Sequence, residues 1–145
     1  IFYERGDVQF VSLHGDPHRA YPYLTGFRDE VGTGVGRGCT SNFPLPARTD
    51  DDAYLQALTA ACGEVAAFQP DFVVVSLGLD TFHDDPIGDL SLTADGFEQA
   101  GAVVAALGMP TVVLQEGGYA VDELGENARR WLLGISALNR PTPAR

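Results

Sequence analysis

The chain has 145 residues, of which 45% are hydrophobic, and this supplies enough apolar material for one domain with a real core. Twenty acidic residues against nine basic ones give a net charge of −11, so nucleic acid is not an expected partner. Neither a run of about 18 apolar residues nor a signal-peptide pattern occurs, so we expect a soluble, cytoplasmic protein with no membrane partner.

Residue usage restricts the chemistry further. All nine basic residues are arginine, so neither a Schiff-base lysine nor the lysine of a phosphate-binding P-loop is available. Cys39 and Cys62 match no Cys-x-x-Cys spacing, which favours two ordinary thiols over a disulfide framework or a thiolate metal site. Because the sequence opens on Ile1 without an initiator methionine, we expect a fragment or a processed chain.

The first predicted elements are a strand and a long loop. Residues 7–14, DVQFVSLH, mix β-branched and aromatic residues and predict a strand. Residues 15–46 are rich in glycine and proline without a sustained period, so we expect one long loop, either functional or disordered. Its aromatic residues indicate that the loop packs against something: Tyr21, Tyr23, Phe27 and Phe43.

A helix and a buried strand follow. Thr49 is the expected N-cap of a helix whose apolar residues recur every three or four positions and which ends at Pro70. Residues 71–78, DFVVVSLG, form a short continuous apolar run, the pattern of a parallel strand covered on both faces.

The alternation of helices and strands then continues. A second helix is predicted from Thr93 to Gly108, and residues 109–115 predict another buried strand. This order predicts one α/β domain with a largely parallel sheet and a frayed tail from about Arg140. A third helix over residues 121–139 is expected to turn four side chains inward: Leu124, Trp131, Leu132 and Ile135.

Polar side chains follow the first buried strand, at the edge of a parallel sheet where ligands bind. Asp80, in GLDTFHDDP, has two possible roles. It is either a metal ligand or general base that the end of the strand holds rigidly, or a residue that caps the turn. The spacing favours solvated loop charges for Asp84 and Asp85, and an exposed loop position for His83.

The motif EGGY, residues 116–119, follows the second buried strand. Two glycines permit a sharp turn that brings Tyr119 over a cleft, where its hydroxyl can donate a hydrogen bond to a developing oxyanion. A plain turn in which Tyr119 packs on the first turn of the next helix stays open as the alternative.

Two other patterns favour structural roles. GTGVGRG at residues 32–38 fits neither Gly-x-Gly-x-x-Gly nor a P-loop, so we expect a flexible or close-packed surface loop and disfavour a phosphate-handling module. His14, Asp16 and His18 alternate after a strand and could line a metal site, but Pro17 and the following loop favour structural hydrogen bonds.

In order and spacing, these segments resemble the C-terminal part of a zinc-dependent deacetylase of the histone deacetylase and acetylpolyamine amidohydrolase family. The resemblance covers nearly the whole chain, in IFYERGDVQFVSLHGDP, YPYLTGFRDEVGTGVG, NFPLP, PDFVVVSLGLDTFHDDPIGDLSLT and MPTVVLQEGGY. It implies a three-layer α/β sandwich of the arginase and deacetylase type with a mostly parallel sheet. Residues 1–145 would be the C-terminal part of a single deacetylase domain, so the sandwich would be incomplete.

The resemblance also implies roles for particular residues. Asp80 matches the last zinc-ligating aspartate of the family, and Tyr119 matches its transition-state tyrosine. Tyr21 lies where the family has an aromatic wall of the acyl-lysine or acylpolyamine channel, and Gly117 and Gly118 resemble the glycines of the pocket floor. His14 and His83 match no family ligand. Two structural sites for a monovalent cation, K⁺, are implied, one with Ser12 and Leu13 and one formed by the backbone carbonyls of Phe2, Arg5, Val8 and Cys39.

Two parts of the family's catalytic machinery fall outside the chain. The other two zinc ligands lie in an Asp-x-His segment just upstream of the FYERGDV equivalent, and the paired histidines that act as base and acid lie further upstream. The 145 residues alone are therefore expected neither to hold zinc tightly nor to turn over substrate.

For the intact protein, the resemblance implies hydrolysis of an acetylpolyamine or an acetyl-lysine-type amide. HGDP and DTFHDDPI look closer to the bacterial acetylpolyamine-type members. A noncatalytic remnant or partner subunit that binds acylated ligands or another protein is the alternative. The oligomeric state is open, with a homodimer as one option.

Overall fold

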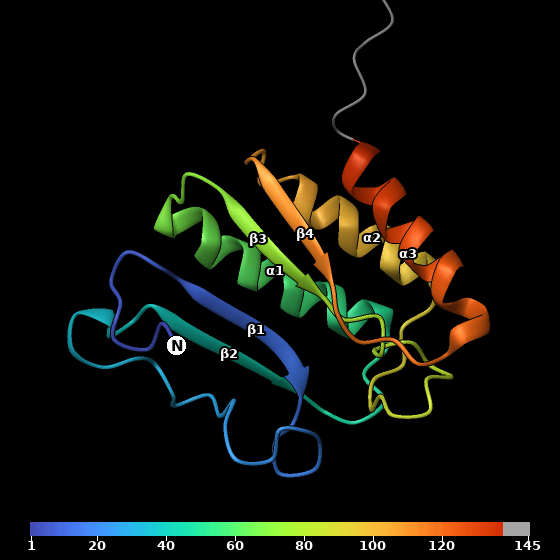
Figure 1. Cartoon of the computed structure of the whole chain (residues 1–145), viewed down its shortest axis with the longest axis horizontal. Coiled ribbons are helices and arrows are strands. Elements are labelled where there is room, and N and C mark those ends of the chain that lie inside the picture. The colour runs from blue at the N-terminus through green and yellow to red at the C-terminus, as the bar shows by residue number, and fades with distance from the viewer. Residues whose placement is uncertain (138–145) are drawn as a thin grey trace, which may run out of the picture.

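A computed structural model of the chain describes residues 1–137 (Figure 1). The predicted tail from Arg140 lies outside the described residues. Among the described residues, no helix is long and apolar enough to cross a membrane. In chain order the elements are β1 (Phe10–Gly15), the short 3-10 helix η1 (Gly34–Gly36), β2 (Thr40–Leu45), α1 (Asp51–Phe68), β3 (Val73–Leu77), α2 (Ala94–Ala105), β4 (Thr111–Gln115) and α3 (Val121–Ser136).

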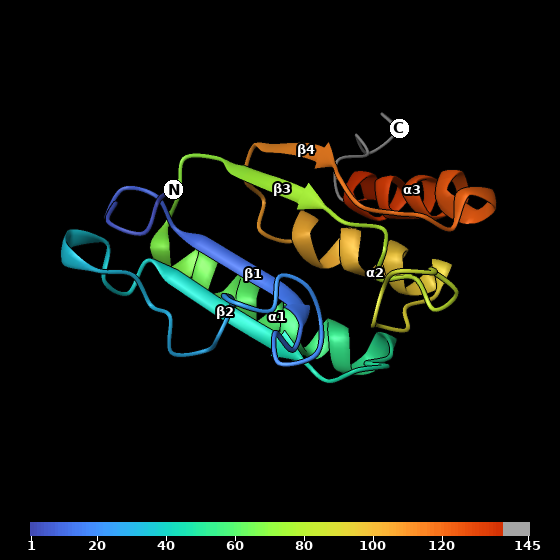
Figure 2. The same ribbon diagram turned by 60° about the horizontal axis from the view of Figure 1, so that its bottom comes forward.

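The four strands form two parallel pairs. β1 pairs with β2 in the register Phe10 to Thr40, and β3 pairs with β4 in the register Val73 to Thr111. The two pairs lie side by side with β1 and β3 as their facing edges, and in this part of the chain no backbone ladder joins those edges (Figures 1 and 2). The predicted α/β class with parallel strands is confirmed.

The helices cover one side of the strands. α1 and α2 lie behind the strands in Figure 1, and α3 packs on α2. The opposite side of β3 and β4 is uncovered, because Val74, Val112 and Leu114 are each more than half exposed. The prediction that these strands are buried on both faces is therefore wrong for this chain. Neighbouring strand residues point to opposite faces, and the described helices cover only one of them.

The first helix begins one residue later than expected. Asp50, not Thr49, is the N-cap of α1, since its carboxylate accepts the Ala53 N–H at 3.1 Å. Thr49 is buried instead, and its hydroxyl donates to the Pro46 carbonyl at 2.7 Å. Both residues are favourable N-caps, and the bond of the Thr49 hydroxyl to the preceding turn leaves Asp50 as the cap.

The other two helices follow the sequence more closely. Thr93 is the N-cap of α2, where its hydroxyl accepts the Gly96 N–H at 3.1 Å, and Gly108 has the positive φ of a helix-ending residue. On α3, Trp131 is 2% exposed and belongs to the core, as expected. Leu132 is 51% exposed, so its predicted inward orientation is wrong.

The predicted long loop contains a strand. Residues 40–45 form β2, whose Pro44 obscured the strand pattern because proline cannot donate to a ladder. The position is tolerated since β2 pairs with β1 alone among the described strands. The loop packs on this strand: the side-chain amide of Asn42 donates to the Phe27 and Glu30 carbonyls at 3.1 and 3.2 Å.

Candidate functional site

The candidate site lies beyond the carboxyl ends of β3 and β4. The pairing of these strands continues into the loops that follow them, because the Glu116 N–H donates to the Leu77 carbonyl at 3.0 Å and the Leu79 N–H to the Gly117 carbonyl at 2.9 Å. Asp80 and Tyr119 therefore follow adjacent strand ends, at the edge where parallel sheets bind ligands.

The Asp80 carboxylate is half-buried and lies directly over Gly117. A Cβ atom at position 117 would contact the carboxylate, with only 2.6 Å to its carbon. Burial raises the pKa of Asp80, a backbone hydrogen bond partly opposes this, and the charge of Asp85 adds to the increase. The ionised form is thus costly here unless a cation lies close to it.

Gly118 makes the sharp turn that the sequence predicts. Its φ is +136°, a conformation open to glycine, and a Cβ there would approach the Leu79 Cβ to 3.0 Å. The turn leaves Tyr119 48% exposed, and its hydroxyl makes no hydrogen bond within residues 1–137. The hydroxyl is therefore free to donate to a ligand.

Asp85 is not the solvated loop charge that the sequence predicts. It is 9% exposed, and its two carboxylate oxygens accept the N–H groups of Ile87, Gly88, Tyr119 and Ala120. Burial by itself would raise the pKa of Asp85, but these hydrogen bonds outweigh it and hold the pKa below its ordinary value.

The local sequence could have predicted the two hydrogen bonds of Asp85 within its own turn. Asp85 precedes Pro86 and Gly88, and an aspartate at such a turn commonly accepts the N–H two residues ahead. The contact with Tyr119, 34 residues away, has no such signal.

The neighbours of Asp85 behave as the sequence predicts. The Asp84 side chain is 76% exposed and pairs with the Nδ1 atom of His83 at 3.0 Å. His83 packs beside Phe82, with ring centroids 4.2 Å apart. Neither residue contributes to the candidate site.

A second tyrosine lies near Asp80. Tyr54 on α1 is packed against the core, and burial, together with the charges of Cys62 and Asp80, raises the pKa of Tyr54 to about 12. Its hydroxyl therefore stays protonated at neutral pH. The helical pattern identified Tyr54 only as a core residue.

Tyr21 lies apart from these groups. It belongs to the loop after β1 and is 80% exposed, and no hydrogen bond or ring contact joins it to Asp80 or Tyr119 in the described part of the chain. Its predicted position in a channel wall stays a prediction.

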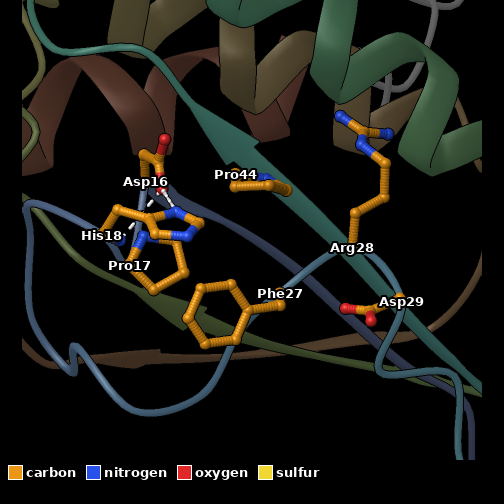
Figure 3. A pocket seen from close by; sticks show the side chains of 7 residues that line it. All are labelled: Asp16, Pro17, His18, Phe27, Arg28, Asp29 and Pro44. Atoms are coloured by element: carbon orange, nitrogen blue, oxygen red, sulfur yellow. Dashed lines mark hydrogen bonds and ion pairs between the residues drawn. The ribbon is translucent and has the colours of Figure 1, made fainter.

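The same loop borders an open pocket of about 450 Å³ (Figure 3). Asp16 pairs with His18 at 2.8 Å inside it, and the ring of Phe27 meets His18 edge to face at a centroid distance of 4.9 Å. Neither Asp80 nor Tyr119 borders this pocket. The pairing confirms the structural role expected for Asp16 and His18.

The first predicted cation group lies on β1. The Ser12 hydroxyl is 2.8 Å from Nδ1 of His14, and the other ring nitrogen of His14 is 2.8 Å from the Gly26 carbonyl. Both nitrogens of His14 are thus engaged, which confirms its structural role. Leu13 neighbours these residues and packs against the core.

The second predicted cation group surrounds the glycine-rich loop. Cys39 lies beside the N-terminal segment, with its thiol 3.9 Å from the Gly6 carbonyl. A Cβ at Gly36 would lie 2.7 Å from the backbone nitrogen of Arg5. The glycine-rich loop is therefore close-packed, which is one of the two predicted alternatives, and not flexible. The fold therefore brings Cys39 and the glycine-rich loop beside residues 3–6, whereas no hydrogen bond joins Phe2 or Val8 to Cys39 in the described residues.

The described residues contain no group of three or more His, Cys, Asp or Glu side chains that could hold a metal ion. A tetrahedral site with three protein ligands needs such a group.

Comparison with known proteins identifies the family. Residues 1–135 match the histone deacetylase domain family. The chain is 45% identical over 140 residues to acetylpolyamine amidohydrolase 2 of Pseudomonas aeruginosa and 46% identical over 136 residues to an acetylpolyamine amidohydrolase of Mycoplana ramosa. These matches cover 97% and 94% of the chain, but 41% and 40% of the two relatives.

Solved structures agree with this. The fold matches a crystal structure of an acetylpolyamine aminohydrolase from Burkholderia pseudomallei with a TM-score of 0.92 and 44% identity, over 95% of this chain and 40% of that one. A histone deacetylase homologue solved with SAHA matches with a TM-score of 0.82 and 32% identity, over 98% of this chain and 38% of that one. The chain thus spans about two fifths of the relatives it matches. It belongs to the histone deacetylase domain family.

Proposed function

We propose that the chain is the C-terminal part of a zinc-dependent amidohydrolase that removes the acetyl group from an acetylated polyamine. The observation that carries the proposal is the pair formed by Asp80 and Tyr119. A half-buried carboxylate and an unbonded tyrosine hydroxyl follow two adjacent strand ends, with Gly117 beneath the carboxylate. Metal-assisted amide hydrolysis needs these two kinds of group.

Asp80 would supply one of the zinc ligands. The donor set fits in part, because the carboxylate is partly desolvated and a cation beside it would offset the cost of its ionised form. The remaining ligands would come from an Asp-x-His segment upstream of Ile1. The facing edges of β1 and β3, which lack a ladder between them, are a suitable location for such a segment. A parallel strand there would end on the same edge as Asp80.

The residues of this chain would act on the acyl group as follows. When bound, zinc polarises the acyl carbonyl and acidifies a water molecule. The Tyr119 hydroxyl donates a hydrogen bond to the carbonyl oxygen as that oxygen gains negative charge. Within residues 1–137 no hydrogen bond joins His83 to Asp80 or Tyr119, and its partner is Asp84, so we assign the proton acceptor to a histidine of the upstream segment.

Acetylated polyamines are the favoured substrate class for two reasons. The relatives named above are acetylpolyamine amidohydrolases that match 94% or more of the chain. The net charge of −11 attracts a cationic amine. An acetyl-lysine peptide is the competing substrate, and the ratio of the two kcat/KM values measures the preference.

The test is acetate release from an N-acetylated diamine by the intact, zinc-loaded protein. Tyr119→Phe removes only the hydroxyl and is expected to lower kcat by roughly a hundredfold to a thousandfold, with zinc content unchanged. Tyr3→Phe, a loss of the same group from a residue that lies against the glycine-rich loop, is the matched control and should keep wild-type turnover. Near-normal turnover of Tyr119→Phe would defeat the assignment. Binding of the diamine without acetate release by the intact protein would favour the noncatalytic alternative.

We also propose the two K⁺ sites, one at Ser12 and Leu13 and one at the carbonyls of Phe2, Arg5, Val8 and Cys39. The close packing of the glycine-rich loop on residues 3–6 supports the second site, because it brings Cys39 beside the N-terminal segment. Replacing K⁺ with a large organic cation should lower the melting temperature of the intact protein. An unchanged melting temperature would contradict both sites.

A further inference from the structure

Asp85 connects the two loops of the candidate site. Its Oδ1 atom accepts the N–H groups of Ile87 and Gly88 at 2.9 and 3.0 Å, which closes the turn after Asp80. Its Oδ2 atom accepts the N–H groups of Tyr119 and Ala120 at 2.7 and 3.1 Å. One carboxylate therefore holds the backbone of both loops.

The second pair of bonds lies just before α3. Ala120 is the N-cap residue of α3 and has no side chain that can accept a hydrogen bond. The carboxylate of Asp85 accepts the N–H of this N-cap residue and that of Tyr119 before it, and its negative charge lies at the favourable end of the helix dipole. The start of α3, and with it Tyr119, is thus attached to the loop that carries Asp80.

The position of Tyr119 depends on this backbone attachment. Its side chain is about half exposed, and its hydroxyl has no partner in residues 1–137, so packing does little to orient it. The preceding Gly117 and Gly118 add conformational freedom to the chain. The Tyr119 N–H, at 2.7 Å from Asp85, is the contact that holds the backbone at Tyr119 itself.

We propose that Asp85 is a positioning residue, which holds the Tyr119 hydroxyl at the distance from the Asp80 loop that the reaction requires. This inference rests on the proposed function. It differs from a purely structural role, because the loss of Asp85 should act on turnover through the Tyr119 hydroxyl.

The test is a double-mutant cycle in the intact, zinc-loaded protein. Asp85→Asn keeps the shape of the side chain, but its NH₂ group cannot accept hydrogen bonds, so one of the two N–H pairs loses its acceptor. We expect kcat for the acetylated diamine to fall roughly tenfold to a hundredfold, with KM and zinc content unchanged. In the Tyr119→Phe background, Asp85→Asn should lower kcat by less than about threefold, because the hydroxyl that Asp85→Asn would displace is already absent.

The neighbouring carboxylate provides the control. Asp84→Asn makes the same chemical change one residue away on an exposed side chain and should leave kcat within about twofold of wild type. If Asp85→Asn does not fold, Asp85→Ser takes its place in the cycle, since a serine hydroxyl can still accept the Ile87 N–H within the turn.

The outcomes separate this inference from the proposed function. Suppose that Tyr119→Phe lowers kcat as expected, but that Asp85→Asn lowers kcat by the same factor in the wild-type and Tyr119→Phe backgrounds. This result would overturn the positioning role of Asp85 and leave the proposed function standing. Loss of zinc from Asp85→Asn would overturn it too. Near-normal turnover of Tyr119→Phe would overturn the proposed function and this inference together.

Discussion

Adding one methyl group at Gly117 is the most direct test of the contact between the two loops. In Gly117→Ala, the new Cβ would lie 2.6 Å from the carboxylate carbon of Asp80 and closer still to Oδ2. Gly117 does not have a positive φ, so alanine suits its backbone and only the clash opposes the substitution.

The size of the effect follows from this distance. Ordinary contact begins at 3.4 Å, so the carboxylate has to withdraw by about 1 Å, and a shift of that size costs roughly a hundredfold in rate. We expect zinc affinity to fall roughly tenfold to a hundredfold. Overpacking should also lower the free energy of unfolding by about 1–3 kcal/mol.

The assay combines three measurements on the intact protein: zinc affinity by competition with a chelator, acetate release from an acetylated diamine, and denaturant unfolding. Gly125→Ala on α3 is the matched control, since nothing lies within 4 Å of its added Cβ. It should stabilise the protein by about 0.5–1 kcal/mol, with unchanged zinc affinity. A Gly117→Ala protein that binds zinc and turns over substrate like wild type would refute the reasoning.

Two further predictions concern stability. Burial by itself would raise the pKa of Glu30, but hydrogen bonds from Thr25, Gly26 and Phe27 to its carboxylate outweigh it and hold the pKa below its ordinary value. The contribution of Glu30 to stability is therefore present above the ordinary pKa of a glutamate and is lost as the pH falls through the lowered pKa, so Glu30→Gln should destabilise the protein at pH 7 and less at about pH 3. An equal difference at both pH values would contradict this. Trp131→Ala should cost about 3–5 kcal/mol in denaturant unfolding, whereas Leu132→Ala on the exposed side should cost under about 1 kcal/mol, and comparable losses would refute the assigned orientation of α3.

The sequence by itself determined the order of the elements apart from β2 and η1, and the residues at the ends of β3 and β4. Apolar runs and helical periodicity predicted β3, β4 and the three helices, because burial and backbone geometry impose these periods locally. Asp80 and Tyr119 could be placed at one edge because parallel strands end on the same side of a sheet. Thr93 and Gly108 were identified because helix caps are local contacts.

Only the tertiary structure decided which side chains are covered and by what. Asp85 and Asp84 are neighbours of the same type, yet Asp85 is buried because Tyr119 and Ala120 donate to it from a distant loop. Leu132 and the outer residues of β3 and β4 match a core pattern, yet they are exposed because the described residues place nothing over them. Periodicity gives the direction of a side chain along its own element. The neighbours of that side chain depend on segments remote in sequence. Such neighbours are Tyr119 and Ala120 for Asp85, and Asp80 for Gly117.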